Sequence, residues 1–312
     1  MEEWSVRLSN HPHFQSIVEL ITSQNPLQKK SIEAFCANQD DTFWKFAEDL
    51  SQTLNEGFLT SLEARNEAAK SYNKMCMDFL REQIKFRKTR KYTITDSMIA
   101  EQTVYNDLVV MRYYMIGLLI SYMLWPNHYK LFRFFLDHLP KKTIKNYLEI
   151  GVGHGLFSST LLDKFPEILG AGIDISETSI HVSQSLLSAF GVNADRLKFI
   201  HSDYLKAEIE PQVFDFIIMG EVLEHVNNAP EFMLKTKQLL APGGTVYLST
   251  CANCPALDHV YHFQCVKHIQ DVITKAGFRI VSETALPADD IPEEDWQEQL
   301  TTINYCCLLE HA

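Results

Sequence analysis

Apolar positions along the chain change their spacing near Pro140. Before this point they recur at helical intervals, as at Phe43, Phe46 and Leu50, and hardly any segment alternates in the manner of a strand. After it, short apolar runs alternate with amphipathic segments, a pattern typical of parallel strands joined by crossover helices. The pattern predicts an all-helical N-terminal domain over residues 1–140 and an α/β domain over residues 141–312.

The second half divides further into strands and helices. Apolar runs predict strands at Asn146–Ile150, Ala171–Asp174, Leu197–Ile200, Phe214–Met219, Thr245–Ser249, Ile280–Glu283 and Ile303–Leu309. Amphipathic segments predict helices at Phe157–Phe165, Glu177–Phe190, Ala229–Leu240 and Val266–Ala276. We expect a Pro242-Gly243-Gly244 turn to separate the fourth strand and helix from the fifth strand.

The net charge argues against a polyphosphate partner. Lys and Arg number 28 against 40 Asp and Glu, which gives a formal net charge of -12. A charge of this sign repels a phosphate backbone unless basic residues cluster, so nucleic acid is a disfavoured partner. The one basic run, residues 85–91, could grip a phosphate, but a solvated helix end explains it more simply.

Cysteine content and the longest apolar stretch indicate a cytoplasmic protein. The seven cysteines lack the dense spacing of a secreted disulfide scaffold, which fits a reducing compartment. The first residues lack the basic and apolar regions of a signal peptide. The stretch Leu108–Trp125 is about as long as a bilayer is thick, but it contains Arg112 and three tyrosines. We therefore expect a buried or interfacial helix there and no membrane span.

A glycine-rich turn follows the first predicted strand. It reads Gly151-Val152-Gly153-His154-Gly155, shortly after Glu149 and directly before an apolar segment. Glycines let a backbone turn tightly against a ligand, while the first amides of the next helix offer positive potential. Nicotinamide enzymes use a similar turn, so the turn alone does not define the cofactor. Their G-x-G-x-x-G register would need glycine at Leu156 or Phe157, which disfavours a dehydrogenase.

Acidic residues follow the second and third predicted strands. Asp174 lies about twenty residues after the glycines, where a carboxylate can accept hydrogen bonds from ribose hydroxyls. Asp203, within His201-Ser202-Asp203-Tyr204, can receive the exocyclic amine of adenine. Together with the glycine turn and the later Pro242-Gly243-Gly244, this set resembles class I S-adenosylmethionine-dependent methyltransferases over roughly the last 170 residues.

The resemblance implies a fold and a cofactor site. The implied fold is a Rossmann-like sheet of order 3-2-1-4-5-7-6 whose last strand is antiparallel. The glycine loop and Glu149 are assigned to the amino-acid end of S-adenosylmethionine, Asp174 to its ribose and Asp203 to its adenine. The cofactor-binding residues that the resemblance implies are Glu149, Gly151, Gly153, Gly155, Asp174, Ile175, Ser202, Asp203, Tyr204, Gly220 and Glu221.

The fourth predicted strand leads into a group of ionisable residues. If the segment Glu221-Val222-Leu223-Glu224-His225 turns helically, Glu221, Glu224 and His225 share one face at the carboxyl end of a central strand, where an open α/β sheet binds its substrate. Carboxylates and an imidazole suit a general base or a divalent cation.

The E-x-x-E-H spacing resembles that of ubiquinone-biosynthesis O-methyltransferases and of small-RNA 3′-terminal 2′-O-methyltransferases. This resemblance implies that Glu221, Glu224 and His225, with His259 or His262, bind a divalent cation such as Mg, Mn or Fe. A metal-free site remains open, in which His225, His259 or His262 acts as base or orienting group and Glu221 shapes the pocket.

Three further features remain open at this point. Cys251-Ala252-Asn253-Cys254 has the spacing of a zinc or redox pair, but without a second pair, incidental pocket-lining cysteines are the simpler interpretation. His154 could touch the cofactor carboxylate or lie exposed to solvent. The tyrosines that could roof the acceptor pocket, or lie in the core instead, are Tyr72, Tyr105, Tyr113, Tyr114 and Tyr129.

These observations predict transfer of a methyl group from S-adenosylmethionine to an oxygen of a small, partly apolar acceptor. Such an acceptor is typical of secondary metabolism. The N-terminal helices are expected to cover the acceptor and to offer a face for a homodimer. Two alternatives are an RNA 2′-O-methyltransferase, which the net charge opposes, and a homologue that binds the cofactor without catalysis.

Overall fold

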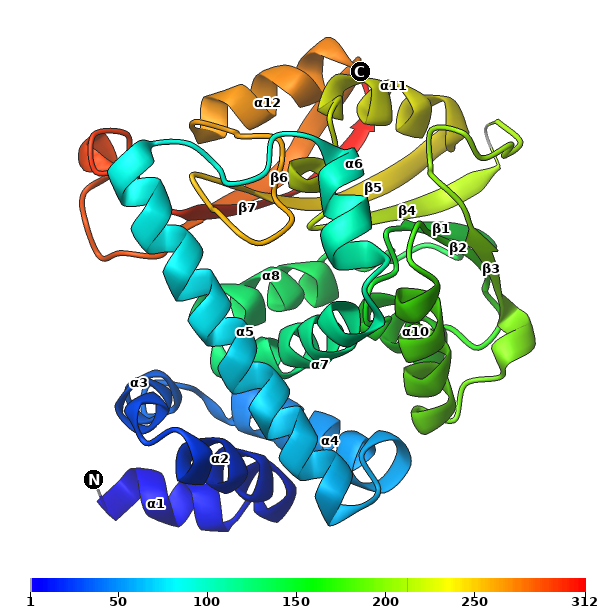
Figure 1. Cartoon of the computed structure of the whole chain (residues 1–312). Coiled ribbons are helices and arrows are strands. Elements are labelled where there is room, and N and C mark those ends of the chain that lie inside the picture. Colours follow the sequence, from blue (N-terminus) through cyan, green and yellow to red (C-terminus); the bar gives the residue numbers. More distant parts are fainter. Residues whose placement is uncertain (1, 212) are drawn as a thin grey trace.

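A seven-stranded mixed sheet forms the centre of the C-terminal half in the computed structural model, which describes residues 2–211 and 213–312 (Figure 1). Its order is β3-β2-β1-β4-β5-β7-β6, and β7 runs antiparallel to both of its neighbours, as predicted. The strands are β1 (Asn146–Ile150), β2 (Leu169–Asp174), β3 (Leu197–His201), β4 (Phe214–Gly220), β5 (Leu240–Ala252), β6 (Phe278–Pro287) and β7 (Ile303–His311).

Helices cover both faces of the sheet because neighbouring residues of each strand point to opposite sides. Phe216 and Ile218 of β4 face one hydrophobic core, and Ile217 and Met219 face the other. The first core includes α8 (Pro126–Asp137), α9 (Leu156–Lys164) and α10 (Glu177–Ala189), and the second includes α11 (Ala229–Leu239) and α12 (Val266–Lys275). The predicted helices are therefore confirmed to within a residue at each end.

The N-terminal half is helical, as predicted. Its helices are α1 (Glu2–Ser9), α2 (Pro12–Gln24), α3 (Leu27–Cys36), α4 (Asp41–Thr53), α5 (Leu62–Thr89), α6 (Ser97–Ala100) and α7 (Leu108–Leu124), with π-helical turns η1 (Leu54–Phe58) and η2 (Glu101–Tyr105). The long helix α5 crosses α7, and α5 and α6 lie on the side of the sheet where β1 and β4 end (Figure 1).

One hydrophobic core continues from these helices onto the sheet. The Phe135 ring of α8 lies 4.9 Å from that of Phe157 in α9 and 5.1 Å from that of Tyr247 in β5, measured between ring centroids. The same cluster extends through α7 to Phe14 in α2. The helical half therefore holds its position on the sheet through close packing and not through a flexible linker.

The segment Pro242-Gly243-Gly244 lies inside β5 and not before it. Leu240 pairs with Phe214, and pairing resumes with Thr245 opposite Phe216, so that residues 241–244 bulge outward. Gly243 adopts a φ of 71°, which glycine tolerates without strain. The predicted start of this strand at Thr245 is therefore wrong, because the bulge interrupts the ladder without ending it.

The stretch Leu108–Leu124 forms the buried helix α7, as expected from its tyrosines. Within the residues that the structure describes, no single helix is long and apolar enough to cross a membrane. Taken together, the segments Ser97–Tyr105 and Leu108–Leu124 have the length and apolar composition of a span, but they meet at a bend of 91°.

Candidate active site

A cavity of about 1090 Å³ lies between the carboxyl ends of the central strands and the helices α5 to α8. Of the eleven predicted cofactor residues, ten line it and Gly155 does not. Its other wall is mostly apolar and includes Phe79, Leu80, Met111, Tyr114, Met115, Leu118, Tyr122 and Trp125. The cavity therefore has room for a nucleoside cofactor beside a second, partly apolar molecule.

The glycine loop is shaped by left-handed backbone at all three glycines. Gly151, Gly153 and Gly155 have φ values of 71°, 51° and 81°, which side chains other than glycine rarely adopt. At Gly155 a Cβ would also lie 2.1 Å from Ser183 Oγ, so this glycine serves close packing of α9 on α10. At Gly153 the nearest atom to such a Cβ is Met115 Sδ, at 3.7 Å, so this glycine leaves open space facing the cavity.

Two buried carboxyls frame this loop. The Asp174 carboxylate accepts hydrogen bonds from the backbone N–H groups of Gly153, at 3.0 Å, and Ser176, at 2.8 Å. Glu149 accepts a hydrogen bond from the Ser158 hydroxyl, and burial raises the pKa of its carboxyl to about 8. Burial also raises the pKa of Asp174, although the two backbone N–H groups oppose the shift. Both carboxyls thus meet the cavity from a low-dielectric wall, where they would gain most from a cationic ligand.

Asp203 and Tyr204 differ in how they reach the cavity. Asp203 accepts from the N–H of Leu205 at 2.9 Å and pairs with Lys206 at 3.1 Å, and its side chain is partly exposed. The Tyr204 ring is buried in the second core, and its hydroxyl meets Thr236 Oγ1 at 3.0 Å. Asp203 is therefore the residue of this pair with a carboxylate available to a base, while Tyr204 is chiefly a packing residue.

Glu221 stands at the end of β4 in an unusual conformation. Its φ is 54°, in the left-handed region, and its N–H donates to the Ser249 carbonyl at 3.0 Å. One carboxylate oxygen, Oε1, is buried without a hydrogen-bond partner within the described residues. Burial and the neighbouring Glu224 raise the pKa of Glu221 well above its usual value. A strained residue with a buried carboxylate oxygen that has no partner among the described residues indicates a binding site.

The predicted helical face of Glu221, Glu224 and His225 does not form as such. Only Leu223–His225 turn as a short 3-10 helix, and the left-handed Glu221 lies outside it. The side chains still gather: Glu224, His225 and His259 can place one ligand atom each within 4.8 Å of one another. Glu221 and Glu224 form a similar group with Cys251.

His225 is held by residues from both halves of the chain. Its Nδ1 lies 3.2 Å from Asp258 Oδ2 and 3.0 Å from the hydroxyl of Tyr105 in η2. The hydroxyl of Tyr114 in α7 donates to the other oxygen of Asp258 at 3.0 Å. Burial alone would lower the pKa of His225, but Asp258 outweighs it and raises this pKa to about 10. The pKa of Asp258 falls to about 2, since His225 outweighs the effect of burial on this carboxyl.

The two later histidines, His259 and His262, have different surroundings. His259 lines the cavity, and its Nδ1 contacts the Cys254 carbonyl at 2.5 Å. His262 is not among the cavity residues: its Nε2 bonds to Asn253 Oδ1 at 2.8 Å, and its ring packs against Phe86 and Tyr92. The structure therefore brings His259 to the predicted group and does not bring His262 there.

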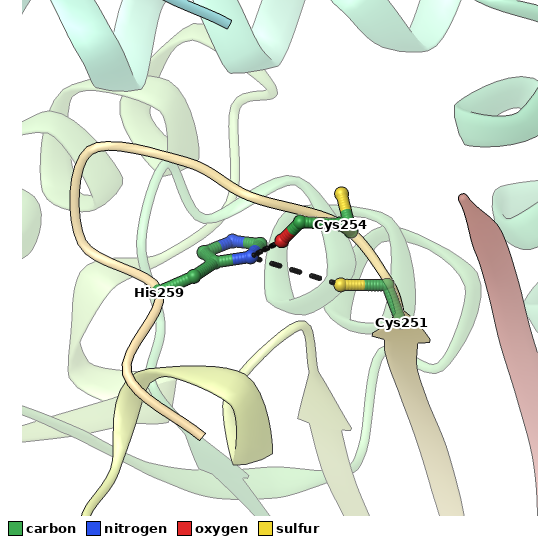
Figure 2. A group of neighbouring side chains, drawn as sticks. All are labelled: Cys251, Cys254 and His259. Atoms are coloured by element: carbon green, nitrogen blue, oxygen red, sulfur yellow. Dashed lines mark hydrogen bonds between the residues drawn. The ribbon is translucent and has the colours of Figure 1, made fainter. Parts of the chain in front are cut away.

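The two cysteines of the C-x-x-C segment lie beside His259 (Figure 2). Cys254 lines the cavity, whereas Cys251 is buried behind it with Sγ 3.8 Å from Glu224 Oε1. A hydrogen bond from Cys251 lowers the pKa of Cys254 to about 6, against the effect of burial, and His259 adds to this shift. Cys254 is thus part of the cavity wall, and Cys251 supports it from behind.

The remaining candidates divide between the cavity and the core. His154 is buried, accepts from the Leu156 N–H at 3.2 Å, and has its pKa lowered to about 3 by burial. It lines the cavity as a neutral ring, so the solvent-exposed alternative is wrong. Of the five tyrosines, Tyr105 and Tyr114 line the cavity, and Tyr72, Tyr113 and Tyr129 do not.

Asp258 lines the cavity and pairs with His225, but the sequence analysis did not single it out. It stands directly before His259, in the same Asp-His segment that drew attention to the histidines. Its side chain is almost fully buried, which is rare for aspartate unless it is paired. An acid beside a candidate histidine was the available signal.

Comparisons with known proteins place the chain in a family. Residues 126–283, just over half of the 312, match the model of a family described as a methyltransferase domain. Over 108 residues the chain is 32% identical to a ubiquinone biosynthesis O-methyltransferase of Leptothrix cholodnii, covering 35% of this chain and 45% of that protein. The chain spans about half the length of the curated relatives that it matches.

Two solved structures share the fold. The [4+2]-cyclase SpnF has a TM-score of 0.52 at 13% identity, covering 70% of this chain and 97% of that chain. Phosphoethanolamine N-methyltransferase 2 of Haemonchus contortus, in complex with S-adenosylmethionine, has a TM-score of 0.52 at 14% identity, covering 70% and 60%. At such identities the likeness shows the fold alone, and one of the two is titled as a cyclase.

The chain belongs to the methyltransferase-domain family. Its sheet order, glycine loop and acidic strand ends are those of the class I S-adenosylmethionine-dependent methyltransferases, as the sequence predicts.

Proposed function

We propose that this protein transfers a methyl group from S-adenosylmethionine to an oxygen atom of a small, partly apolar acceptor. One observation carries the proposal: a single cavity joins the glycine loop and Asp174 to an apolar wall from α5 and α7, with Glu221 and His225 at the junction. The O-methyltransferase relatives support oxygen as the acceptor atom.

The residues on the cofactor side fit a sulfonium nucleoside. Gly153 leaves space for close approach, Asp174 and Asp203 offer acceptors for ribose and adenine, and the site needs no phosphate contact. The bound cofactor would supply an electrophilic methyl group. Glu149, buried beside the loop, would pair with the positive charge of its amino-acid end.

The residues on the acceptor side would orient and polarise a hydroxyl. Asp258 and Tyr105 hold Nδ1 of His225, which leaves Nε2 as the ring nitrogen for an acceptor oxygen. Because Asp258 raises its pKa, the His225 imidazole is protonated near neutral pH, so it would stabilise the acceptor oxygen as an oxyanion and lower the pKa of the hydroxyl. The hydroxyl proton would then leave to solvent before the oxygen takes the methyl group. Alignment between the two halves of the cavity would supply much of the acceleration.

A divalent cation fits the same junction. Glu221 Oε1 has no hydrogen-bond partner in the part of the chain that the structure describes. Nδ1 of His225 contacts a carboxylate and Nδ1 of His259 contacts a carbonyl, as is usual for metal-binding imidazoles. Glu221, Glu224, His225 and His259 would therefore hold an ion such as Mg, Mn or Fe, and binding would displace the His225 proton. Such an ion would lower the pKa of a hydroxyl bound to it.

The test is a methyl-transfer assay on the full chain. Purified protein with labelled S-adenosylmethionine is offered phenols, catechols, enols and aliphatic alcohols, with and without Mn²⁺, and products are identified by mass spectrometry. We expect acceptor-dependent S-adenosylhomocysteine and an O-methyl product. Methyl on nitrogen or on RNA would refute the proposed acceptor class, and saturable cofactor binding without turnover on any acceptor would refute catalysis.

A further inference from the structure

A pair of buried thiols lies beside His259, and one of them, Cys254, lines the cavity. Cys251 is 0% exposed at the end of β5, and Cys254 is 9% exposed three residues later. Each can place its sulfur within 4.8 Å of the other sulfur and of a ring nitrogen of His259. Figure 2 shows the three side chains: the Cys251 thiol and the Cys254 carbonyl are directed toward the imidazole, and the Cys254 thiol points away from it.

The turn between the cysteines is strained and firmly braced. Asn253 has a φ of 50°, a conformation that needs support in any residue except glycine. Its backbone N–H donates to the Phe263 carbonyl at 3.0 Å, and its carbonyl accepts from the Thr302 hydroxyl at 2.8 Å. Its side chain bonds to the Gln264 carbonyl at 3.1 Å and to His262 Nε2 at 2.8 Å. Four hydrogen bonds thus hold the backbone that keeps the second thiol near the first.

A carboxylate stands where a fourth donor is needed. Glu224 is 0% exposed, and its Oε1 lies 3.8 Å from Cys251 Sγ, while Thr250 donates to its other oxygen at 2.7 Å. In a tetrahedral zinc site, ligand atoms lie roughly 3.3–3.8 Å apart, given Zn–S and Zn–N distances of about 2.3 and 2.0 Å. To reach that geometry, the Cys254 side chain would rotate toward His259 and the ligand atoms would close from their present separation of up to 4.8 Å.

We propose that Cys251, Cys254 and His259, with Glu224 as fourth ligand, bind one thiophilic divalent cation of the zinc class. The proposal shares Glu224 and His259 with the cation site of the proposed function, and it rests on that function only in placing a cation at this wall. It is an alternative to the Mg, Mn or Fe ion there, because thiolates select Zn²⁺ over Mg²⁺. Binding exchanges protons for metal: each cysteine that still carries an S–H proton releases it to solvent as its S–metal bond forms. The Nδ1 proton of His259, now donated to the Cys254 carbonyl, moves to Nε2, so that Nδ1 is free to bind the ion.

The test uses full-length protein reduced with a phosphine and freed of metal by dialysis. A thiol titration first confirms that all seven cysteines are free. Co²⁺ is then titrated and followed by its ultraviolet thiolate charge-transfer absorption, and Zn²⁺ is used to displace it. We expect one Co²⁺ per chain with a thiolate band, displaced by stoichiometric Zn²⁺ and not by excess Mg²⁺.

Cysteine variants test whether Co²⁺ binds at Cys251 and Cys254 and not at another cysteine. Cys251→Ser and Cys254→Ser should each lower Co²⁺ affinity at least tenfold and weaken the band, whereas Cys265→Ser, a partly exposed cysteine nearby in sequence, should leave both unchanged. Calorimetry of S-adenosylhomocysteine binding shows that each variant is folded.

Two results would overturn the proposal. One is Co²⁺ bound without a thiolate band and lost only in Glu221→Gln, which would mean a hard cation site alone. The other is no bound ion in a chain that still takes up S-adenosylhomocysteine. Neither result depends on methyl transfer, so failure here is distinct from failure of the proposed function.

Discussion

The imidazole of His225 and the carboxylate of Asp258 form an ion pair in the wall of the cavity, with Nδ1 3.2 Å from Oδ2. The two residues come from different strand ends, β4 and the loop after β5, and they perturb each other's pKa in opposite directions. Because each charge stabilises the other, making one partner neutral should change the free energy of unfolding.

Replacing Asp258 with asparagine should lower the free energy of unfolding by roughly 3–5 kcal/mol near neutral pH, since a buried charge loses its partner. His225 has a folded pKa of about 10 against an ordinary 6.5, so its share of the stability is complete below pH 6.5 and is lost as the pH rises through 10. The stability difference between the wild type and Asp258→Asn should therefore narrow from pH 6.5 to pH 10. Urea unfolding at both values measures it, and a gap independent of pH would show that the pair is not ionic.

The tyrosines of the helical half test whether that half completes the active site. Tyr114→Phe removes a hydroxyl that donates to Asp258, and Tyr113→Phe removes one that donates to Asp78, outside the cavity, at 2.9 Å. Both should cost about 1–2 kcal/mol of stability. Only Tyr114→Phe should also shift the imidazole pKa of His225, seen by NMR titration, and lower kcat for the acceptor found in the transfer assay. Equal effects of the two variants on kcat would assign Tyr114 a structural role alone.

The sequence predicted the parts of this site that depend on neighbouring residues and missed the contacts between residues far apart in the chain. The glycine loop and Asp174 follow from local pattern, because a strand, a tight turn and a helix are encoded within a few residues. The contact of Tyr114 with Asp258 joins residues 144 positions apart, and no periodicity encodes such a pair. His259 and His262 lie in one irregular loop, where spacing does not tell which ring faces the cavity.

The sequence did not predict the backbone strain at Glu221 either. Helical spacing put Glu221 on a face with Glu224 and His225, yet its φ of 54° takes it out of any helix. Glutamate has no local preference for that region, so only the tertiary fold can impose it, here through the Ser249 carbonyl on β5. The same residues gather, but by a different geometry from the one predicted.

Two of the three loop glycines, Gly153 and Gly155, should separate the effect of packing from that of ligand binding. Gly155→Ala places a methyl group on Ser183 at a φ of 81° and should destabilise the protein by about 3 kcal/mol or more. Gly153→Ala meets only Met115 at 3.7 Å, so it should cost about 1–2 kcal/mol for its φ of 51° and weaken cofactor binding instead. Thermal unfolding and calorimetry with S-adenosylhomocysteine measure both; the reverse order of stabilities would refute this division.

Glu149 should make stability fall with pH. Its folded pKa is about 8 against an ordinary 4.5, so between these values the folded chain retains a proton that the unfolded chain releases, and stability declines as the pH rises. Glu149→Gln imitates the protonated form and should be more stable than the wild type at pH 8 but not at pH 4.5. Glu167→Gln, at an exposed position, is the matched control. A stability difference between the wild type and Glu149→Gln that stays constant from pH 4.5 to pH 8 would mean that Glu149 is ionised throughout this range.

Replacing Glu221 should raise the stability of the protein and weaken its binding of a cation. Its buried carboxyl has an unpartnered oxygen and lies next to Glu224, which with burial raises its pKa well above the usual value. Without a cation, Glu221→Gln removes this repulsion and should raise the melting temperature at pH 8. With Mn²⁺, the wild type should gain melting temperature and the variant should gain less, because the variant has lost a carboxylate ligand. Glu210→Gln, at an exposed position, controls for net charge. An equal gain in both proteins would place the ion elsewhere, and a less stable variant without a cation would mean that an unseen donor already satisfies the carboxylate.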